Sequence, residues 1–346
     1  MTPAPDATAF SEPPFVIAIG ASAGGIEALV QLTKKFPSDL PAAVLVVVHF
    51  PSYGKSVLPQ ILNRRGVLPV SHAQDGAAIV PGQIYIAPPD YHLLVQPGSI
   101  CLSHGPRENG HRPAIDMLFR SVARVYQSRA IGVVLSGALD DGTIGLELIK
   151  SQGGIAIVQD SEEALFDSMP CSAIANVEVD YVLRIADIAE TLSKLVTRPT
   201  LEDPMTPDDQ IKQEADIVAE DKAALERGEY SGRSSAVTCP ECGGVLWELQ
   251  KDSIVHFRCH VGHAYSLDSL IAEQSEMVEQ ALWAAVRALE EKAALARRMA
   301  SHAHQQNRRL TENQFQQRAH EAGHSAELLR QILLKSSKHL PTDQAG

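Results

Sequence analysis

Three residue types that together form a hydrolytic triad each follow an apolar, strand-like segment. Ser22 lies in the turn sequence Gly-Ala-Ser-Ala-Gly at 20–24, a G-x-S-x-G pattern whose small residues let a serine hydroxyl project from a strand-to-helix turn. His49 directly follows the apolar run 42–48, and Asp141 comes shortly after a third such run. If these strands are parallel, the three side chains meet at the carboxyl edge of one sheet, where open α/β sheets bind ligands. The pattern therefore predicts a serine nucleophile, an imidazole base and an orienting carboxylate.

Other interpretations of these residues stay open at this point. The turn at 20–24 would also suit a structural turn or a phosphate at a helix N-terminus, and His49 would suit a partly buried structural histidine. The order Ser, His, Asp differs from the Ser, Asp, His order of α/β-hydrolases, which disfavours a general lipase or esterase. Asp140, beside Asp141, is a second candidate carboxylate or a cap for a helix that begins near Thr143.

A second group of reactive side chains lies in the last third of the chain. Cys239 and Cys242 form a C-x₂-C pair, and Cys259 and His263 follow after a 16-residue gap with C-x₃-H spacing. Three thiolates and one imidazole complete a tetrahedral zinc site that has no open position for catalysis. A redox pair and inert thiols are the alternatives. His260 competes with His263 for the fourth position, but a ligand adjacent to Cys259 would strain the loop.

The elements that must position these residues follow from hydrophobic periodicity. Strand-like and helix-like segments alternate from Phe15 to about Leu195, which predicts an α/β fold with a doubly wound, mostly parallel sheet. Short strands within 83–103 interrupt the alternation and predict an antiparallel edge hairpin. Two alternating segments within 245–258 predict a small zinc ribbon-like hairpin between the two halves of the cysteine cluster.

The region after the cysteines is predicted to be helical. Ser266 is a suitable N-cap for a long helix, and a second helix is expected from about Thr311 to Leu334. A helical hairpin and a dimerising coiled coil are both compatible with this pattern. The first helix carries apolar residues at sevenfold spacing: Leu282, Leu289, Ala296, Ala303 and Leu310.

Composition restricts the classes of function. The hydrophobic content of 45% indicates a globular protein, and a chain of 346 residues is too long for one domain. A formal net charge of −12 argues against nucleic acid as a partner. No apolar run approaches the roughly 20 residues that span a bilayer, so we expect a cytoplasmic protein without membrane insertion. Five cysteines, three of them in a metal-like pattern, do not suit a secreted disulfide framework.

The expected organisation is a disordered N-terminus (1–13), an α/β domain (14–197), an acidic linker (198–235), a zinc-binding module (236–265), a helical hairpin or coiled coil (266–337) and a disordered tail (338–346).

Six motifs follow one another in the first half of the chain: G-A-S-A-G-G at 20–25, V-H-F-P at 48–51, I-Y-I-A-P-P-D-Y-H at 84–92, H-R-P-A-I-D at 111–116, L-S-G with D-G within 135–142, and S-M-P at 168–170. Over residues 14–197 they resemble the catalytic domain of the CheB-type chemotaxis protein-glutamate methylesterases. The resemblance implies that Ser22 attacks the methyl ester of a receptor glutamate, that His49 acts as base and then acid, and that Asp141 orients His49. Deamidation of receptor glutamines is implied as a second reaction.

The resemblance also implies further roles. The backbone N–H of Ala138 matches an oxyanion position of the family, and the elbow geometry adds Ala23 as a second donor. Arg112, in the H-R-P motif, is expected to hold a substrate carboxylate, with an exposed loop as the alternative. No cofactor is expected for catalysis, and the zinc ion is expected to be structural. The implied partners are methylated chemoreceptor helices, with a signalling protein or a second copy bound through the C-terminal helices.

Two departures from the family pattern matter. The family usually has Asn-Asp-Gly where this chain has Asp140-Asp141-Gly142. Its best-known members also carry an N-terminal phospho-receiver domain, whereas only a loop-like segment precedes the first predicted strand. Control is then expected to be absent or to come from the linker, zinc module and helices. The runner-up hypothesis is a catalytically weak adaptor that binds a partner through the module and helices.

Overall fold

The computed structural model describes residues 13–49, 56–197, 233–251 and 254–336. Nearly all of the predicted N-terminal segment, most of the acidic linker and nearly all of the tail lie outside the described residues. The chain divides into two compact units, Met1–Leu270 and Ile271–Gly346. No helix in the described ranges combines the length and the apolar character needed to cross a bilayer.

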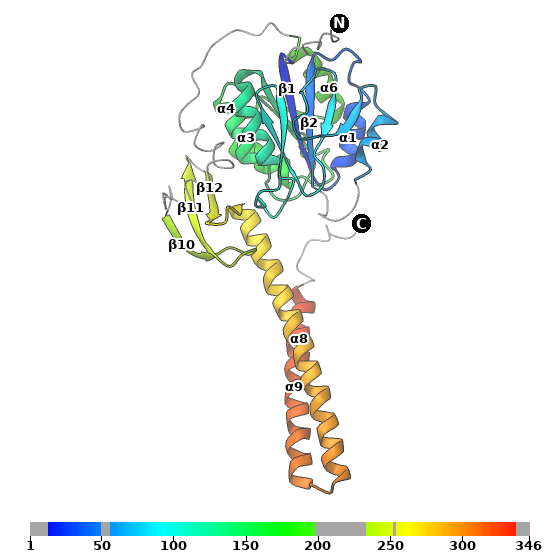
Figure 1. Ribbon diagram of the computed structural model, residues 1–346, viewed down its shortest axis with the longest axis vertical. Helices are drawn as coiled ribbons and strands as arrows, with labels where there is room; N and C mark the ends of the chain where they lie inside the picture. The colour runs from blue at the N-terminus through cyan, green and yellow to red at the C-terminus, as the bar shows by residue number, and fades with distance from the viewer. Residues whose placement is uncertain (1–12, 50–55, 198–232, 252–253, 337–346) are drawn as a thin grey trace, which may run out of the picture. The chain divides into compact units, whose positions relative to one another are not determined.

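Strands and helices alternate through the first part of the chain (Figure 1). The elements are β1 (Phe15–Ala21), α1 (Gly25–Thr33), β2 (Ala42–Val48), α2 (Leu58–Asn63), β3 (Val70–His72), β4 (Ile84–Ile86), β5 (His92–Gln96), β6 (Ser99–Ser103), α3 (Ile115–Tyr126), a 3₁₀ turn (Gln127–Arg129), β7 (Ala130–Val134), α4 (Thr143–Ser151), β8 (Ile155–Gln159), α5 (Ser168–Asn176), β9 (Tyr181–Leu183) and α6 (Ile185–Leu195).

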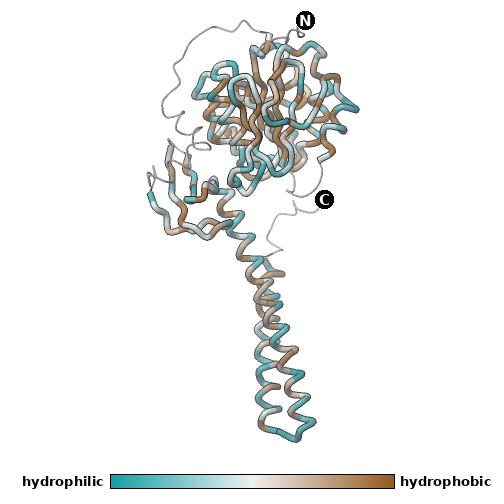
Figure 2. Tube along the Cα trace, in the orientation of Figure 1, coloured by the Kyte–Doolittle hydropathy of each residue, from teal (hydrophilic) through white to brown (hydrophobic). Residues whose placement is uncertain are grey.

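Seven strands form one sheet in the order β3-β4-β2-β1-β7-β8-β9, and every pairing in it is parallel. All residues of β1 and β2 are buried, as expected for central strands that helices cover on both faces. Figure 2 shows these strands among the most hydrophobic segments of the chain. The predicted doubly wound α/β fold is confirmed.

Alternate residues of the strands contribute to two separate hydrophobic layers. Ile17 and Val44 pack with α1, α2 and α6 on one face, whereas Val16 and Leu45 pack with α3, α4 and α5 on the other. Figure 1 shows α3 and α4 on one side of the sheet and α1, α2 and α6 on the opposite side. Because each helix covers a fixed face of the sheet, the loop that leads from a strand into that helix must leave the carboxyl end of the strand toward the same face.

The strand order reverses at β1, because the chain builds β2, β4 and β3 on one side of it and β7, β8 and β9 on the other. Ligands of open α/β sheets bind at such a switch point, outside the carboxyl ends of the strands. Ser22 follows β1, His49 follows β2 and Asp141 follows β7. The three predicted triad residues therefore start from adjacent strands at the switch point.

The predicted antiparallel hairpin is present as β5 and β6, but it forms a two-stranded sheet of its own. The edges of the seven-stranded sheet are instead β3 and β9, each only three residues long. The hairpin packs beside α3, and the N–H of Val95 donates a hydrogen bond to Ser121 Oγ at 3.0 Å. The segment that leads from this hairpin into α3 passes the triad.

The cysteine-rich region forms an antiparallel sheet in the order β10-β11-β12-β13. Its strands are β10 (Arg233–Thr238), β11 (Val245–Lys251), β12 (Ile254–Cys259) and β13 (Ala264–Ser266). Leu246, Tyr265 and Leu270 contribute to its small apolar core, and Cys239 and Cys259 are buried within it. A core of this size is too small to hold such a module without further cross-links.

Two long helices follow, α8 (Leu267–Gln305) and α9 (Arg309–Ser336), and Figure 1 shows them as a hairpin. Arg330 of α9 pairs with Glu290 of α8. The sevenfold seam is only partly correct, because Ala296 and Ala303 are buried but Leu310, at the start of α9, is 82% exposed. The buried contact is instead made mainly of alanines, which allow close approach of the helices.

Candidate active site and cysteine cluster

The turn after β1 places Ser22 between strand and helix. The N–H of Ser22 donates to the carbonyl of Ser136 at 3.0 Å, and Gly24 has φ of 72° as the residue before α1. A side chain at Gly24 would meet Leu165 and Ser136 at 2.8 Å, and a Cβ at Gly137 would lie 2.9 Å from the Cβ of Ser22. The local sequence is therefore small because two chain segments approach the serine closely.

Ser22, His49 and Asp141 form a connected hydrogen-bonded series. Ser22 Oγ lies 3.2 Å from His49 Nδ1, and His49 Nε2 lies 2.8 Å from Asp141 Oδ2. Because the carboxylate can only accept, Nε2 carries the proton in the neutral ring and Nδ1 presents its lone pair to the serine hydroxyl. The two ring nitrogens have exchanged the partners they have in the chymotrypsin arrangement. The geometry is that of a serine nucleophile with an oriented base.

Asp141 is 2% exposed and accepts four hydrogen bonds. Its donors are His49 Nε2, the backbone N–H of Ile115 at 2.7 Å, the backbone N–H of Asp116 at 3.2 Å and Asn109 Nδ2 at 3.0 Å. Burial acts to raise the pKa of Asp141, but the His49 hydrogen bond, the neighbouring imidazoles and the Ile115 N–H together hold it below its ordinary value. The carboxylate therefore remains ionised beside His49.

His111 stacks on the His49 imidazole, with the ring centroids at 3.7 Å and an interplanar angle of 16°. His111 Nδ1 donates to the carbonyl of Asn109 at 2.6 Å. Burial and the charge of His49 lower the pKa of His111 to about 4. A neutral ring therefore covers one face of His49. The sequence places His111 in a family motif but gives no signal of this stacking.

Asn109 and Asp116 are further residues that sequence reasoning did not assign to the site. Asn109 Nδ2 also donates to Asp116 Oδ2 at 3.2 Å, and the N–H of Gly145 donates to Asp116 Oδ1 at 2.7 Å. Burial and the charge of Asp141 raise the pKa of Asp116 well above its ordinary value. Of the two neighbouring carboxylates, Asp141 is thus kept ionised and Asp116 is pushed toward its neutral form.

The predicted oxyanion donors belong to the two chain segments that meet at Ser22. Ala23 directly precedes Gly24 and α1, and Ala138 follows the Gly137 turn, which is bonded to Phe166. Among the described residues, no backbone hydrogen bond uses the N–H of Ala23 or of Ala138. Both groups are therefore compatible with an oxyanion role, which stays a prediction.

Arg112 makes three hydrogen bonds inside the chain. Its Nε and Nη2 donate to Asp90 Oδ1 at 3.0 and 2.7 Å, and Nη1 donates to the carbonyl of Gly105 at 2.8 Å. The Arg112 hydrogen bond and His104 lower the pKa of Asp90. Substrate binding by Arg112 stays a prediction, and it requires a guanidinium that already pairs with Asp90 to accept a second carboxylate.

The Asp140 carboxylate makes no capping hydrogen bond to α4 among the described residues, although the Asp140 backbone carbonyl accepts from the N–H of Thr143 at 3.1 Å. Its Oδ1 instead accepts hydrogen bonds from the hydroxyls of Ser266 at 2.7 Å and Ser269 at 3.0 Å. Ser266 Oγ in turn accepts from the N–H of Ser269 at 3.1 Å, so Ser266 is the N-cap predicted for the long helix. Burial raises the pKa of Asp140 despite these two donors.

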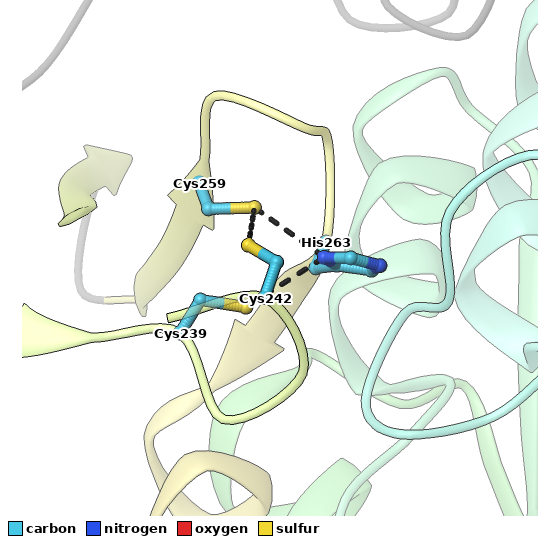
Figure 3. A group of neighbouring side chains, drawn as sticks. All are labelled: Cys239, Cys242, Cys259 and His263. Atoms are coloured by element: carbon cyan, nitrogen blue, oxygen red, sulfur yellow. Dashed lines mark hydrogen bonds between the residues drawn. The ribbon is translucent and has the colours of Figure 1, made fainter. Parts of the chain in front are cut away.

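Cys239, Cys242, Cys259 and His263 converge, with one potential ligand atom from each within 4.8 Å of the others. Figure 3 shows their side chains pointing toward one another. The Sγ atoms of Cys242 and Cys259 are 3.6 Å apart, and His263 Nδ1 lies 3.5 Å from Cys259 Sγ. Tetrahedral bonds of about 2.3 Å to sulfur imply edges of roughly 3.8 Å, so the separations suit one zinc ion.

The fourth position is occupied by His263, whereas the competitor His260 is exposed and outside the group. His263 Nε2 lies 3.0 Å from Glu241 Oε2. A carboxylate that accepts from the distal nitrogen of a histidine ligand fixes the ring for metal binding through Nδ1. Glu241, within the C-x₂-C pair, is a supporting residue that the spacing analysis did not identify.

A serine, a histidine and an aspartate lie at the carboxyl ends of three adjacent strands of a parallel sheet and are joined by hydrogen bonds. This combination defines the class of the protein as an α/β fold with a triad of the serine-hydrolase type. The profile of the CheB methylesterase family matches residues 17–192. The chain belongs to the CheB methylesterase family.

Known relatives support this assignment. A Methanosarcina mazei protein named protein-glutamate methylesterase/protein-glutamine glutaminase 2 is 39% identical over 189 residues, which are 52% of each chain. A Leptospira interrogans relative is 39% identical over 180 residues, covering 52% of this chain and 93% of that protein. The crystal structure of the Thermotoga maritima CheB methylesterase catalytic domain is similar with a TM-score of 0.51 and 36% identity, over 52% of this chain and 98% of that domain. The chain spans about half the length of the Methanosarcina relative.

We predict a graded loss of esterase activity across the triad. Ser22→Ala and His49→Ala should each lower kcat by at least about a thousandfold. Asp141→Asn should cost less than either, because the imidazole stays present but poorly oriented, and Asp140→Asn should cost less than Asp141→Asn. Steady-state kinetics on one ester substrate measure the series, and equal or reversed losses for the two aspartate variants contradict the assignment.

We also predict that His111 makes stability depend on pH. Between about pH 6.5 and about pH 4 the unfolded imidazole binds a proton that the folded one does not. The free energy of unfolding should therefore fall as pH is lowered through this window, by on the order of 3 kcal/mol. His111→Gln should remove this part of the slope, and burial of His92 should leave a residual slope of the same sign.

Hydrogen exchange of α3 amides at increasing urea, at several pH values, measures the effect. His104→Gln is the control, because the His104 side chain is 54% exposed. An unchanged slope in His111→Gln would show that His111 is not kept neutral by the fold.

Proposed function

We propose that this protein hydrolyses γ-glutamyl methyl esters of a chemoreceptor through a Ser22 acyl-enzyme. The observation that carries the proposal is the continuous series from Ser22 Oγ through His49 to a buried, ionised Asp141. Membership of the methylesterase family and the names of relatives supply the substrate class. Receptor glutamines are a second substrate class, because the same attack on an amide releases ammonia in place of methanol.

The geometry gives each group a step. Ser22 Oγ attacks the ester carbonyl carbon while its proton passes to His49 Nδ1, and Asp141 accepts from the Nε2–H of the imidazolium. The N–H groups of Ala23 and Ala138 stabilise the oxyanion. Collapse of the tetrahedral adduct releases methanol with the proton from Nδ1. Water, activated by the same nitrogen, then releases the glutamate carboxylate and restores the serine.

We further propose that the cysteine cluster holds one structural zinc ion. Three thiolates and the Nδ1 of an oriented histidine form a closed set of four ligands. The ion would cross-link the turns that precede β11 and β13 and supply the stability that the small core lacks. It contributes no step to hydrolysis. A cytoplasmic location remains a sequence-based prediction that such thiolate ligands favour.

The alternative of a catalytically weak adaptor predicts a lost nucleophile or base, or a triad that the fold keeps apart. Neither is observed, because all three side chains are present and in contact. Binding of a signalling protein or a second copy through α8 and α9 remains a prediction that is independent of the esterase.

The proposed reaction is tested by incubating the full chain with methyl-labelled receptor membranes and following methanol release. Wild-type protein should release methanol, and Ser22→Ala should not. Ser193→Ala is the matched control, because in the part of the chain that the structure describes its hydroxyl donates within α6, to the carbonyl of Ala189. If a fluorophosphonate modifies Ser22 of the wild-type protein but no methanol is released, the protein is a hydrolase with a different ester substrate.

We predict one zinc ion per chain after purification without chelator. Cys259→Ser and His263→Ala should abolish stoichiometric zinc, because each removes one of four ligands. His260→Ala should retain it, since that ring lies outside the cluster. Elemental analysis of the purified variants measures the stoichiometry. The ligand assignment is wrong if His260→Ala loses the metal and His263→Ala keeps it.

A further inference from the structure

The segment that leads into α3 is joined to the cysteine-rich sheet. The N–H of Asn109 donates to the carbonyl of Ala264 at 2.8 Å, and the N–H of Ala264 donates to the carbonyl of Arg107 at 3.3 Å. These bonds make a parallel bridge between Glu108 and Ala264, the first residue of β13. Ala264 directly follows His263, so a ligand of the cysteine cluster is one residue from this junction.

Asn109 uses every polar atom that it has. Its Nδ2 donates to Asp141 Oδ1 and to Asp116 Oδ2, and its Oδ1 accepts from the N–H of Ser266 at 2.8 Å. The residue is 2% exposed and has φ of 52°, which asparagine tolerates better than most residues. The amide therefore links the last residue of β13 to the Asp141 carboxylate through direct hydrogen bonds.

Other contacts join the same two parts of the unit. Asp140, adjacent to the catalytic aspartate, holds the hydroxyls of Ser266 and Ser269. Arg107 lies 3.6 Å from Glu241, the carboxylate that orients His263. Both carboxylates of the Asp140–Asp141 pair are thus connected to the end of the cysteine-rich sheet. Asp140 binds Ser266 directly, and Asp141 is linked to Ser266 through Asn109.

We propose that Asn109 is a positioning residue for Asp141 and that metal binding at the cysteine cluster holds Asn109 in place, so that full kcat requires the loaded module. The inference rests on the proposed Ser22 hydrolase. Without metal, the small sheet lacks the cross-link that orders β13. Ala264 and Ser266 then cease to hold Asn109, and Asp141 loses a donor and its fixed orientation toward His49. The oxyanion and substrate contacts lie elsewhere, so KM changes little.

A double-mutant cycle on the full chain tests this coupling. Asn109→Ala and Cys259→Ser should each lower kcat by about ten- to a hundredfold, the effect of one hydrogen bond to a charged group, with KM within about twofold. The double variant should be no slower than the slower single variant, because both changes act through one contact. Asn109→Ala should keep its zinc. Asn176→Ala and His260→Ala should match wild type, since the Asn176 amide donates to Ser172 within α5 and, among the described residues, has no other hydrogen bond.

A second readout needs no receptor, and it compares the wild type with Asn109→Ala. The rate at which a fluorophosphonate modifies Ser22 should fall when wild-type protein is treated with a chelator and recover when zinc is returned. In Asn109→Ala the rate should be low and insensitive to the chelator. Additive losses in the cycle, or full activity in zinc-free Cys259→Ser, would overturn the proposal. Fluorophosphonate labelling does not depend on the ester substrate. If wild-type protein releases no methanol from receptor membranes, the proposed function is contradicted, and the labelling rates still decide the role of Asn109.

Discussion

A buried carboxylate has to be supplied with donors, and this requirement organises the structure around Asp141. Two of its four donors are the first N–H groups of α3, so Asp141 acts as the cap that α3 otherwise lacks. The end of β7 and the start of α3 must therefore meet, which fixes the segment before α3. That segment carries Asn109 and His111 to the other sides of the triad. Helix capping and orientation of His49 are performed by one side chain.

The ionisable groups near the triad are arranged so that one negative charge faces His49. Asp116 is pushed toward its neutral form, and His111 stays neutral at physiological pH. Burial acts to raise the pKa of Glu108, but Arg120, which binds it in bidentate fashion, and Arg258 of β12 lower it. Neither Asp116 nor the paired Glu108 then competes strongly with Asp141 for the imidazolium that forms during attack on an ester, a condition that makes an orienting carboxylate more effective.

Sequence patterns predicted those parts of the molecule that depend on local periodicity or short spacing. The apolar runs of β1 and β2, the small residues around Ser22 and the spacing of the cysteine ligands are of this kind. They did not predict Asn109 or Glu241 as supporting residues, because a contact between residues 109 and 266 leaves no periodic trace in the chain. The three-residue edge strands were too short to be recognised. The helical seam was only partly correct, because buried alanines give a weaker sequence pattern than leucines such as the exposed Leu310.

The departure from the family pattern at Asp140 is physically matched to the appended module. Two adjacent carboxylates repel each other, and here separate donors offset the repulsion: Asp141 faces the first turn of α3, whereas Asp140 faces the first turn of α8. Each carboxylate thus lies at a different helix N-terminus, where backbone N–H groups and the dipole favour negative charge. An asparagine at 140 would also accept the two serine hydroxyls, but a carboxylate forms stronger, charge-assisted bonds with them. The second aspartate therefore belongs chemically to the junction with the module, and only the first belongs to the triad.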